Sequence, residues 1–123
     1  MTRNVARVVL PATPIAARRA REIVAERCAT FDSDVIETAQ LLTSELVTNA
    51  VIHGRSDVSL QVSVDSGLVR VDVADDNSRH PQRQPLDAEA LDGRGLQIVQ
   101  LLAARWGVAD EPLGKRVWFE LSS

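Results

Sequence analysis

The chain has 123 residues, enough for one domain whose core needs neither disulfides nor a structural metal. Fourteen basic against 17 acidic residues give a net charge of −3, which leaves no general attraction to nucleic acid or to an anionic membrane. Cys28 is the only cysteine, which excludes a disulfide within the chain and a thiolate metal cluster. Without a membrane-length apolar run or a signal peptide, we expect a single cytoplasmic domain over residues 1–123.

The N-terminal half predicts a strand followed by two helices. Residues 5–10 read as a short strand, and Thr13-Pro14 offers a capping hydroxyl followed by proline at the first helical position. The helix that begins there runs to about Cys28. Ser33-Asp34 starts a second, central helix, which ends at Gly54. The apolar stripe of the first helix consists of Ala16, Ala20, Ile23 and Val24.

The central helix carries a carboxylate and a carboxamide at the border of its apolar stripe. Leu42, Leu46 and Ala50 recur at helical spacing and form this stripe. Glu45 and Asn49 are four residues apart, which stacks their side chains on one face beside it. Two interpretations stay open here: both are ordinary border residues between core and solvent, or they line a pocket.

A hairpin with a carboxylate at its end is predicted after the central helix. Residues 57–65 alternate strictly between apolar and polar, and after an Asp-Ser-Gly turn the alternation resumes with valines from Val69 to Val73. One further step of this period places Asp75 on the inward face with the valines. A buried carboxylate there needs a partner from protein or ligand. The alternative is that the strand has ended and Asp75 faces solvent in a turn.

The C-terminal third predicts a long loop, a helix and two closing strands. The polar segment 77–92 contains two prolines and has the length of a lid or binding loop. Gly93-Arg94-Gly95 opens a helix from Leu96 to about Arg105, a pattern that either cradles phosphate or simply makes a turn. Residues 106–109 and 115–121 read as strands. The whole order predicts an α/β chain, an α+β two-layer sandwich whose mixed, mainly antiparallel sheet carries helices on one face.

Four of these features, in this order, resemble the GHKL, or Bergerat-fold, ATP-binding domain. They are the helix with Glu45 and Asn49, the strand ending in Asp75, the Gly-Arg-Gly-Leu sequence before a helix, and Gly114-Lys115 before the last strand. The ordered set covers nearly the whole chain and is far more specific than any one member. Within that superfamily, the sequence of residues 44–54 most resembles that of the bacterial anti-sigma factor serine kinases.

The resemblance implies ATP and Mg²⁺ as cofactors and gives roles to particular residues. Asn49 would coordinate the Mg²⁺ that bridges the nucleotide phosphates, and Glu45 would be the catalytic base that activates the attacking hydroxyl. Asp75 would accept a hydrogen bond from the adenine amino group. The other nucleotide-binding residues implied are His53, Asn77, Gly93, Arg94, Gly95, Leu96 and Lys115.

The chain departs from the family pattern in two motifs, and its lid segment between Asn77 and Gly93 lacks the glycine-rich character of larger family members. Where the family usually carries Asp-x-Gly-x-Gly, residues 75–79 read Asp-Asp-Asn-Ser-Arg, so that Asn77, which tolerates a left-handed backbone, takes the place of the first glycine. Where the family usually carries Gly-Thr, this chain reads Gly114-Lys115. Lys115 either approaches a phosphate or only flanks the strand, and the sequence favours neither.

Three functions follow from the resemblance. The first is an ATP-dependent switch protein that phosphorylates a serine or threonine of an anti-anti-sigma (STAS-type) partner, binds a sigma factor and forms a homodimer. The second is a nucleotide-binding interaction module with weak or no catalysis, which the altered glycine motif favours. The third is a detached catalytic domain like that of histidine kinases. The sequence of the central helix disfavours this third function, because it is closer to the anti-sigma kinases. None of them requires direct contact with nucleic acid or membrane.

Overall fold

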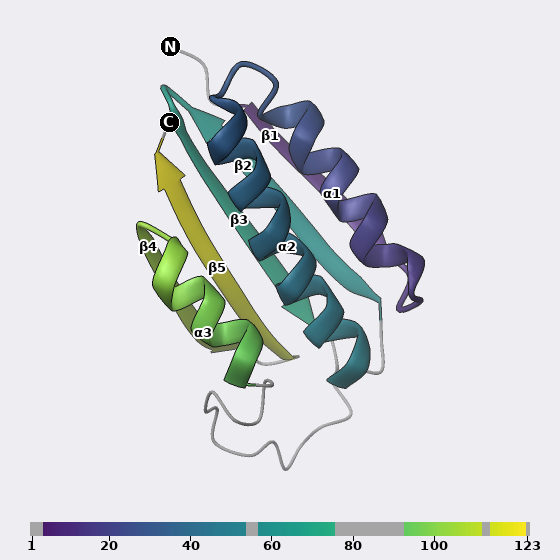
Figure 1. Ribbon diagram of the computed structural model, residues 1–123. Coiled ribbons are helices and arrows are strands. Elements are labelled where there is room, and N and C mark those ends of the chain that lie inside the picture. The colour runs from purple at the N-terminus through teal and green to yellow at the C-terminus, as the bar shows by residue number, and fades with distance from the viewer. Residues whose placement is uncertain (1–3, 54–56, 76–92, 112–113, 123) are drawn as a thin grey trace.

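The computed structural model describes residues 4–53, 57–75, 93–111 and 114–122, which form five strands and three helices (Figure 1). The predicted loop 77–92 lies outside these residues. No described helix is both long and apolar enough to cross a bilayer. In chain order the elements are β1 (Asn4–Leu10), α1 (Ile15–Arg27), α2 (Ser33–His53), β2 (Val58–Asp65), β3 (Leu68–Asp75), α3 (Gly93–Leu102), β4 (Arg105–Glu111) and β5 (Gly114–Ser122).

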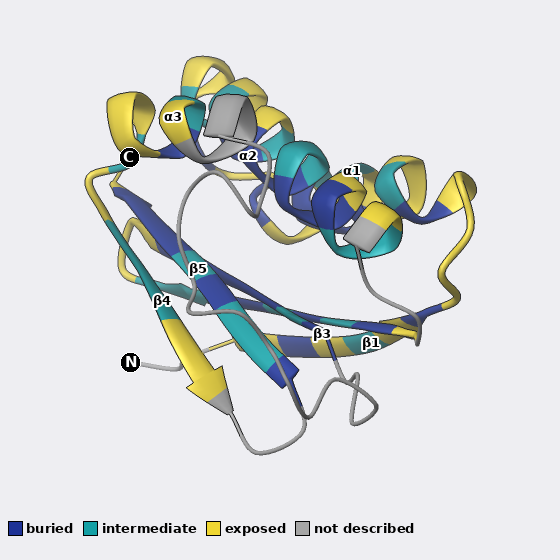
Figure 2. Cartoon of the chain, turned by 90° about the horizontal axis from the view of Figure 1, so that it is seen from below, coloured by how far each residue is buried: buried dark blue, intermediate teal, exposed yellow. Residues whose placement is uncertain are grey.

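The strands form one sheet in the order β1-β2-β3-β5-β4, and every neighbouring pair is antiparallel. The three helices lie on one face of this sheet, and the described residues leave the other face uncovered (Figure 2). The predicted two-layer α+β sandwich is therefore confirmed. The sheet is antiparallel throughout the described strands rather than mixed.

The hairpin β2–β3 fixes the register at the centre of the sheet. Asp65 pairs with Leu68, which leaves Ser66 and Gly67 as a two-residue turn. Both turn residues have positive φ, 51° and 80°, the combination that matches the right-handed twist of the flanking strands. With this register the valines of the two strands share one side of the sheet, as their alternation predicts.

The core lies between the sheet and the helices. Every second residue of β2, β3 and β5 points towards the helices, and Phe119 of β5 is fully buried at its centre. The apolar stripes of α1 and α2 cover these side chains, as their helical spacing predicts. The largest fully buried side chains are Phe119, Leu42, Leu60, Val24, Val47, Val58, Val62, Val69, Val71 and Val99.

Two helix ends differ from the sequence prediction. Pro14 takes the N-cap position of α1 and makes no side-chain cap, while the Thr13 carbonyl accepts the Ala16 N–H at 3.0 Å, so the predicted Thr13 hydroxyl cap is wrong. Helix α3 ends at Leu102 rather than near Arg105. The Ala104 N–H donates to the Glu120 carbonyl at 2.9 Å, so pairing with β5 ends the helix before Arg105.

Strand β1 is one edge of the sheet and pairs only with β2. Its alternate residues Val5, Arg7 and Val9 lie on the uncovered face, where Val9 is 64% exposed. The Arg7 side chain crosses to the neighbouring strand, where its Nε donates to Gln61 Oε1 at 2.9 Å. A cation therefore stands between the two exposed valines of this edge.

Candidate nucleotide site

Helix α2 brings Glu45 and Asn49 to the border of the core. Asn49 is buried, with 6% of its surface exposed, whereas Glu45 is half-buried. Asn49 lies one turn closer than Glu45 to the C-terminal end of α2. The carboxamide is enclosed and the carboxylate remains accessible. A buried amide and a half-buried carboxylate fit the border of a pocket, and they also fit ordinary border residues between core and solvent, so both interpretations stay open.

Strand β3 ends with a buried carboxylate. Asp75 is the last residue of the strand and is 8% exposed. It lies opposite Val58 in β2 and Lys115 in β5, and side chains opposite each other in antiparallel strands point to the same face. Asp75 therefore points to the helix side with the valines. The alternative in which the strand stops earlier and Asp75 faces solvent is wrong.

The elements that carry these residues converge at one end of the molecule. The C-terminal end of α2, the last residues of β3, the first turn of α3 and the start of β5 lie at the same end of the sandwich (Figure 1). Helix α2 also contacts β3, β5 and α3 directly. Lys115 joins this group because its Cα is paired with that of Asp75. Residues that lie far apart in the sequence thus reach a single region.

For several predicted site residues the structure describes only the backbone, and for Asn77 it describes nothing. Gly93, Arg94, Gly95 and Leu96 form the first turn of α3, and His53 is the last residue of α2. The free N–H groups of a helix start favour a negatively charged ligand, which is consistent with the predicted phosphate contact. The side chains of these residues lie outside the described part of the chain, as does Asn77 altogether. Their roles stay predictions.

The site fits Mg²⁺ that is held mainly by a nucleotide. Within the described residues no group of three or more His, Cys, Asp or Glu side chains is placed to hold a metal. Mg²⁺ commonly takes one or two protein oxygens and completes its shell with phosphates and water. The buried carboxamide oxygen of Asn49 is a suitable hard ligand of this kind. The residues present therefore fit a metal that arrives with its nucleotide.

Sequence reasoning did not predict a second polar cluster, on the uncovered face of the sheet. Asp72 and Glu120 are 3% and 8% exposed and lie among Arg70, Arg105 and Arg116. The alternation of β3 already places Arg70 and Asp72 on the face opposite the valines. The other members come from β4 and β5, and only the strand order shows that they adjoin.

The antiparallel sheet with helices on one face, with the ends of α2 and β3 at the same end of the sandwich, matches the fold of the GHKL class. Residues 10–121 match the histidine kinase-like ATPase domain, and the chain belongs to that family. The family predicted from the four ordered motifs is therefore confirmed. A comparison with curated protein sequences gave no match.

Two solved structures show how widely the fold extends. The chain is similar to the crystal structure of the RsbU and RsbW domains of Rv1364c from Mycobacterium tuberculosis, with 23% identity and a TM-score of 0.75 over 97% of this chain. It is also similar to a histidine kinase domain from the blue-light activated histidine kinase EL346 of Erythrobacter litoralis, with 24% identity and a TM-score of 0.52 over 91% of this chain. The chain spans 32% of the first protein and 61% of the second. At these identities the likeness shows the fold alone.

Proposed function

We propose that this chain is an ATP-binding switch protein of the anti-sigma kinase type. It transfers the γ-phosphoryl group of ATP to a serine or threonine of an anti-anti-sigma partner of STAS type, and it binds a sigma factor. One observation carries the proposal. In a chain of this ATPase family, the helix with Glu45 and Asn49 ends near the end of β3, where Asp75 lies. The likeness to a structure that contains an RsbW domain also supports a protein of the anti-sigma kinase type.

The proposed chemical step uses Glu45 as the base. The acceptor hydroxyl oxygen attacks the γ-phosphorus, the bond from that phosphorus to the oxygen bridging to the β-phosphate breaks, and ADP leaves with the bonding electrons. The hydroxyl proton passes to the Glu45 carboxylate, which is only half-buried and so is reachable by a docked partner. Mg²⁺ held by Asn49 and the phosphates would supply charge neutralisation on the phosphate oxygens.

The adenine ring is assigned to the end of β3. An ionised carboxylate is acceptor-only and therefore pairs with the exocyclic amino group of adenine, but not with the carbonyl that guanine carries at the same position. Burial of Asp75 strengthens this discrimination, because a mismatched polar group inside a site is costly to leave unpaired. In this proposal Asp75 favours adenine over guanine nucleotides.

Calorimetric titration with ATP and Mg²⁺ tests the pocket. Asn49→Ala is expected to weaken Mg²⁺-dependent ATP binding by at least about tenfold, since it removes the only metal ligand proposed from the protein. Thr48→Ala, at the exposed neighbouring position on α2, is the matched control and is expected to bind like the wild type. Equal affinities for wild type and Asn49→Ala would show that the site assignment is wrong.

Phosphotransfer separates the kinase from the interaction module that the altered glycine motif favours. Glu45→Gln keeps the shape of the side chain but cannot take the proton, so we expect ATP binding to persist and transfer of labelled phosphate to a STAS-type acceptor to disappear. ATP binding without transfer by the wild type would instead support the module. The homodimer implied by the resemblance is measured separately, by sedimentation of the wild-type chain.

A further inference from the structure

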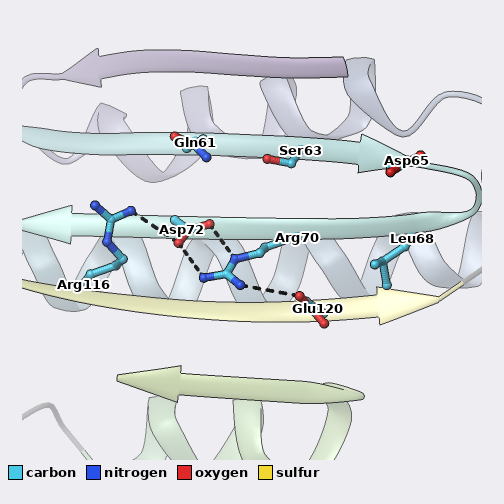
Figure 3. Close-up of a pocket in the computed structure, with 8 residues that line it drawn as sticks. All are labelled: Gln61, Ser63, Asp65, Leu68, Arg70, Asp72, Arg116 and Glu120. Atoms are coloured by element: carbon cyan, nitrogen blue, oxygen red, sulfur yellow. Dashed lines mark hydrogen bonds and ion pairs between the residues drawn. The ribbon is translucent and has the colours of Figure 1, made fainter. Parts of the chain in front are cut away.

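The uncovered face of the sheet contains a polar groove of about 570 Å³ (Figure 3). Its lining comes from β2, β3 and β5, from residues that alternate with those of the core. The groove is therefore on the opposite face of the sheet from Asn49 and Asp75. It is lined by Gln61, Ser63, Asp65, Leu68, Arg70, Asp72, Arg116 and Glu120.

Two carboxylates at the floor of the groove are bound by three guanidinium groups. Asp72 accepts hydrogen bonds from Arg70 Nε at 3.0 Å and Nη2 at 3.2 Å, and from Arg116 Nη1 at 3.4 Å. Glu120 forms ion pairs with Arg70 Nη1 and Arg105 Nη1, both at 3.6 Å. The hydrogen bond to Asp72 is the main reason that the pKa of Arg70 is raised. Arg70 thus joins the two carboxylates across the strands.

Exposure within this network is strongly asymmetric. The side chains of Asp72 and Glu120 are 4% and 11% exposed, whereas those of Arg70, Arg116 and Arg105 are 37%, 35% and 73% exposed. A guanidinium has five N–H donors, more than these contacts use. The acidic groups are therefore covered by the groups that neutralise them. A partner therefore first meets the N–H donors of the arginines. The third carboxylate that lines the groove, Asp65, lies apart from them at the hairpin end (Figure 3).

An aromatic ring extends this surface next to the arginines. The guanidinium of Arg70 lies 4.1 Å from the ring centroid of Trp118, and that of Arg105 lies 6.0 Å from it. Gly107 in β4 makes room for the ring, since a Cβ there would lie 2.7 Å from three of its atoms. Leu68 adds an exposed apolar side chain at the edge of the groove. Half-exposed tryptophan and arginine side chains are the residues that most often dominate protein interfaces.

We propose that this face docks an acidic segment of a protein partner. Carboxylates of the segment bind the outward N–H groups of Arg70, Arg105 and Arg116, and its apolar side chains contact Trp118 and Leu68. Charge complementarity selects this occupant, because this face exposes guanidinium groups while it buries the carboxylates paired with them. Bidentate pairing of guanidinium with carboxylate supplies the geometry. The proposal concerns a different face from the nucleotide site and does not depend on ATP binding.

The test is an NMR titration of the ¹⁵N-labelled full chain with a short peptide of alternating glutamate and valine residues, at low salt. We expect saturable shifts on β3, β4 and β5, and a dissociation constant that increases with salt. Arg105→Ala is expected to weaken binding by about tenfold. Arg18→Ala is the matched control, because its side chain is also 73% exposed and also ion-paired with a glutamate, but lies on α1. Binding of ATP is expected to be the same in both variants and the wild type.

Three results would overturn the proposal. Absence of saturable binding at low salt is the first, and equal affinity for the same peptide with lysine in place of glutamate is the second. The third is sedimentation that shows a wild-type dimer which Arg105→Ala dissociates and Arg18→Ala does not. That result would assign the face to a second copy of this chain.

Discussion

Raising the pH from 8 to 10 is expected to destabilise the fold by about 1 kcal/mol through one side chain, the Cys28 thiol. Cys28 is fully buried at the end of α1, and this burial raises the pKa of the thiol from its ordinary 9.0 to about 11. The unfolded chain begins to release this proton near pH 9, whereas the folded chain retains it until about pH 11. The folded state binds more protons in this window, so its stability decreases as the pH rises, by at most about 1.4 kcal/mol per pH unit.

The composition of the chain makes this measurement unusually clear. It contains no tyrosine and a single lysine, Lys115, so few other side chains titrate in the same range. The free energy of unfolding is measured by urea titration at several pH values, for the wild type and for Cys28→Ala. In the variant the part of the pH dependence that comes from Cys28 disappears, although the smaller side chain lowers stability at every pH. The same decrease in both proteins, or none in the wild type, would refute the reasoning.

Three further predictions concern single side chains. Gly107→Ala places a methyl group 2.7 Å from the Trp118 ring, so we expect it to lower the free energy of unfolding by about 1–3 kcal/mol in urea titration, and far less in a Trp118→Ala background. Thr43 is fully buried, and its hydroxyl has no hydrogen-bond partner among the described residues. Thr43→Val is therefore expected to stabilise the chain by about 1 kcal/mol, and a lower melting temperature would contradict this. Asp75→Asn is expected to reduce the preference for ADP over GDP in competition binding, and an unchanged preference would exclude Asp75 from base recognition.

The central hairpin and the end of β3 were predictable from the sequence because their information is local. Strict alternation fixes which side chains share a face, and a two-residue turn fixes the register. Asp75 follows from extending that alternation by one residue, and the face of Glu45 and Asn49 follows from helical spacing. These positions depend on near neighbours in the chain, so one sequence is enough to find them.

The arginine–carboxylate network was not predictable, because it depends on strands that are distant in the chain. Arg70 lies opposite Glu120 in β5, 50 residues later, and the pairing becomes visible only when β5 is known to adjoin β3. The end of α3 has the same cause: its apolar pattern continues, but pairing of residue 104 with β5 stops the helix. The Thr13 cap failed for a local reason, since Pro14 takes the capping position itself.

The edge position of β1 has a consequence for solubility. An edge strand presents unpaired backbone groups to which another chain can add, and β1 also exposes Val5 and Val9. Arg7 is its only charged residue and stands between those valines, with its guanidinium held over the sheet by Gln61. A strand added along this edge would bring its side chains next to the one charged residue of β1. We therefore expect Arg7 to oppose aggregation along this edge, as a charged residue in an apolar edge strand does.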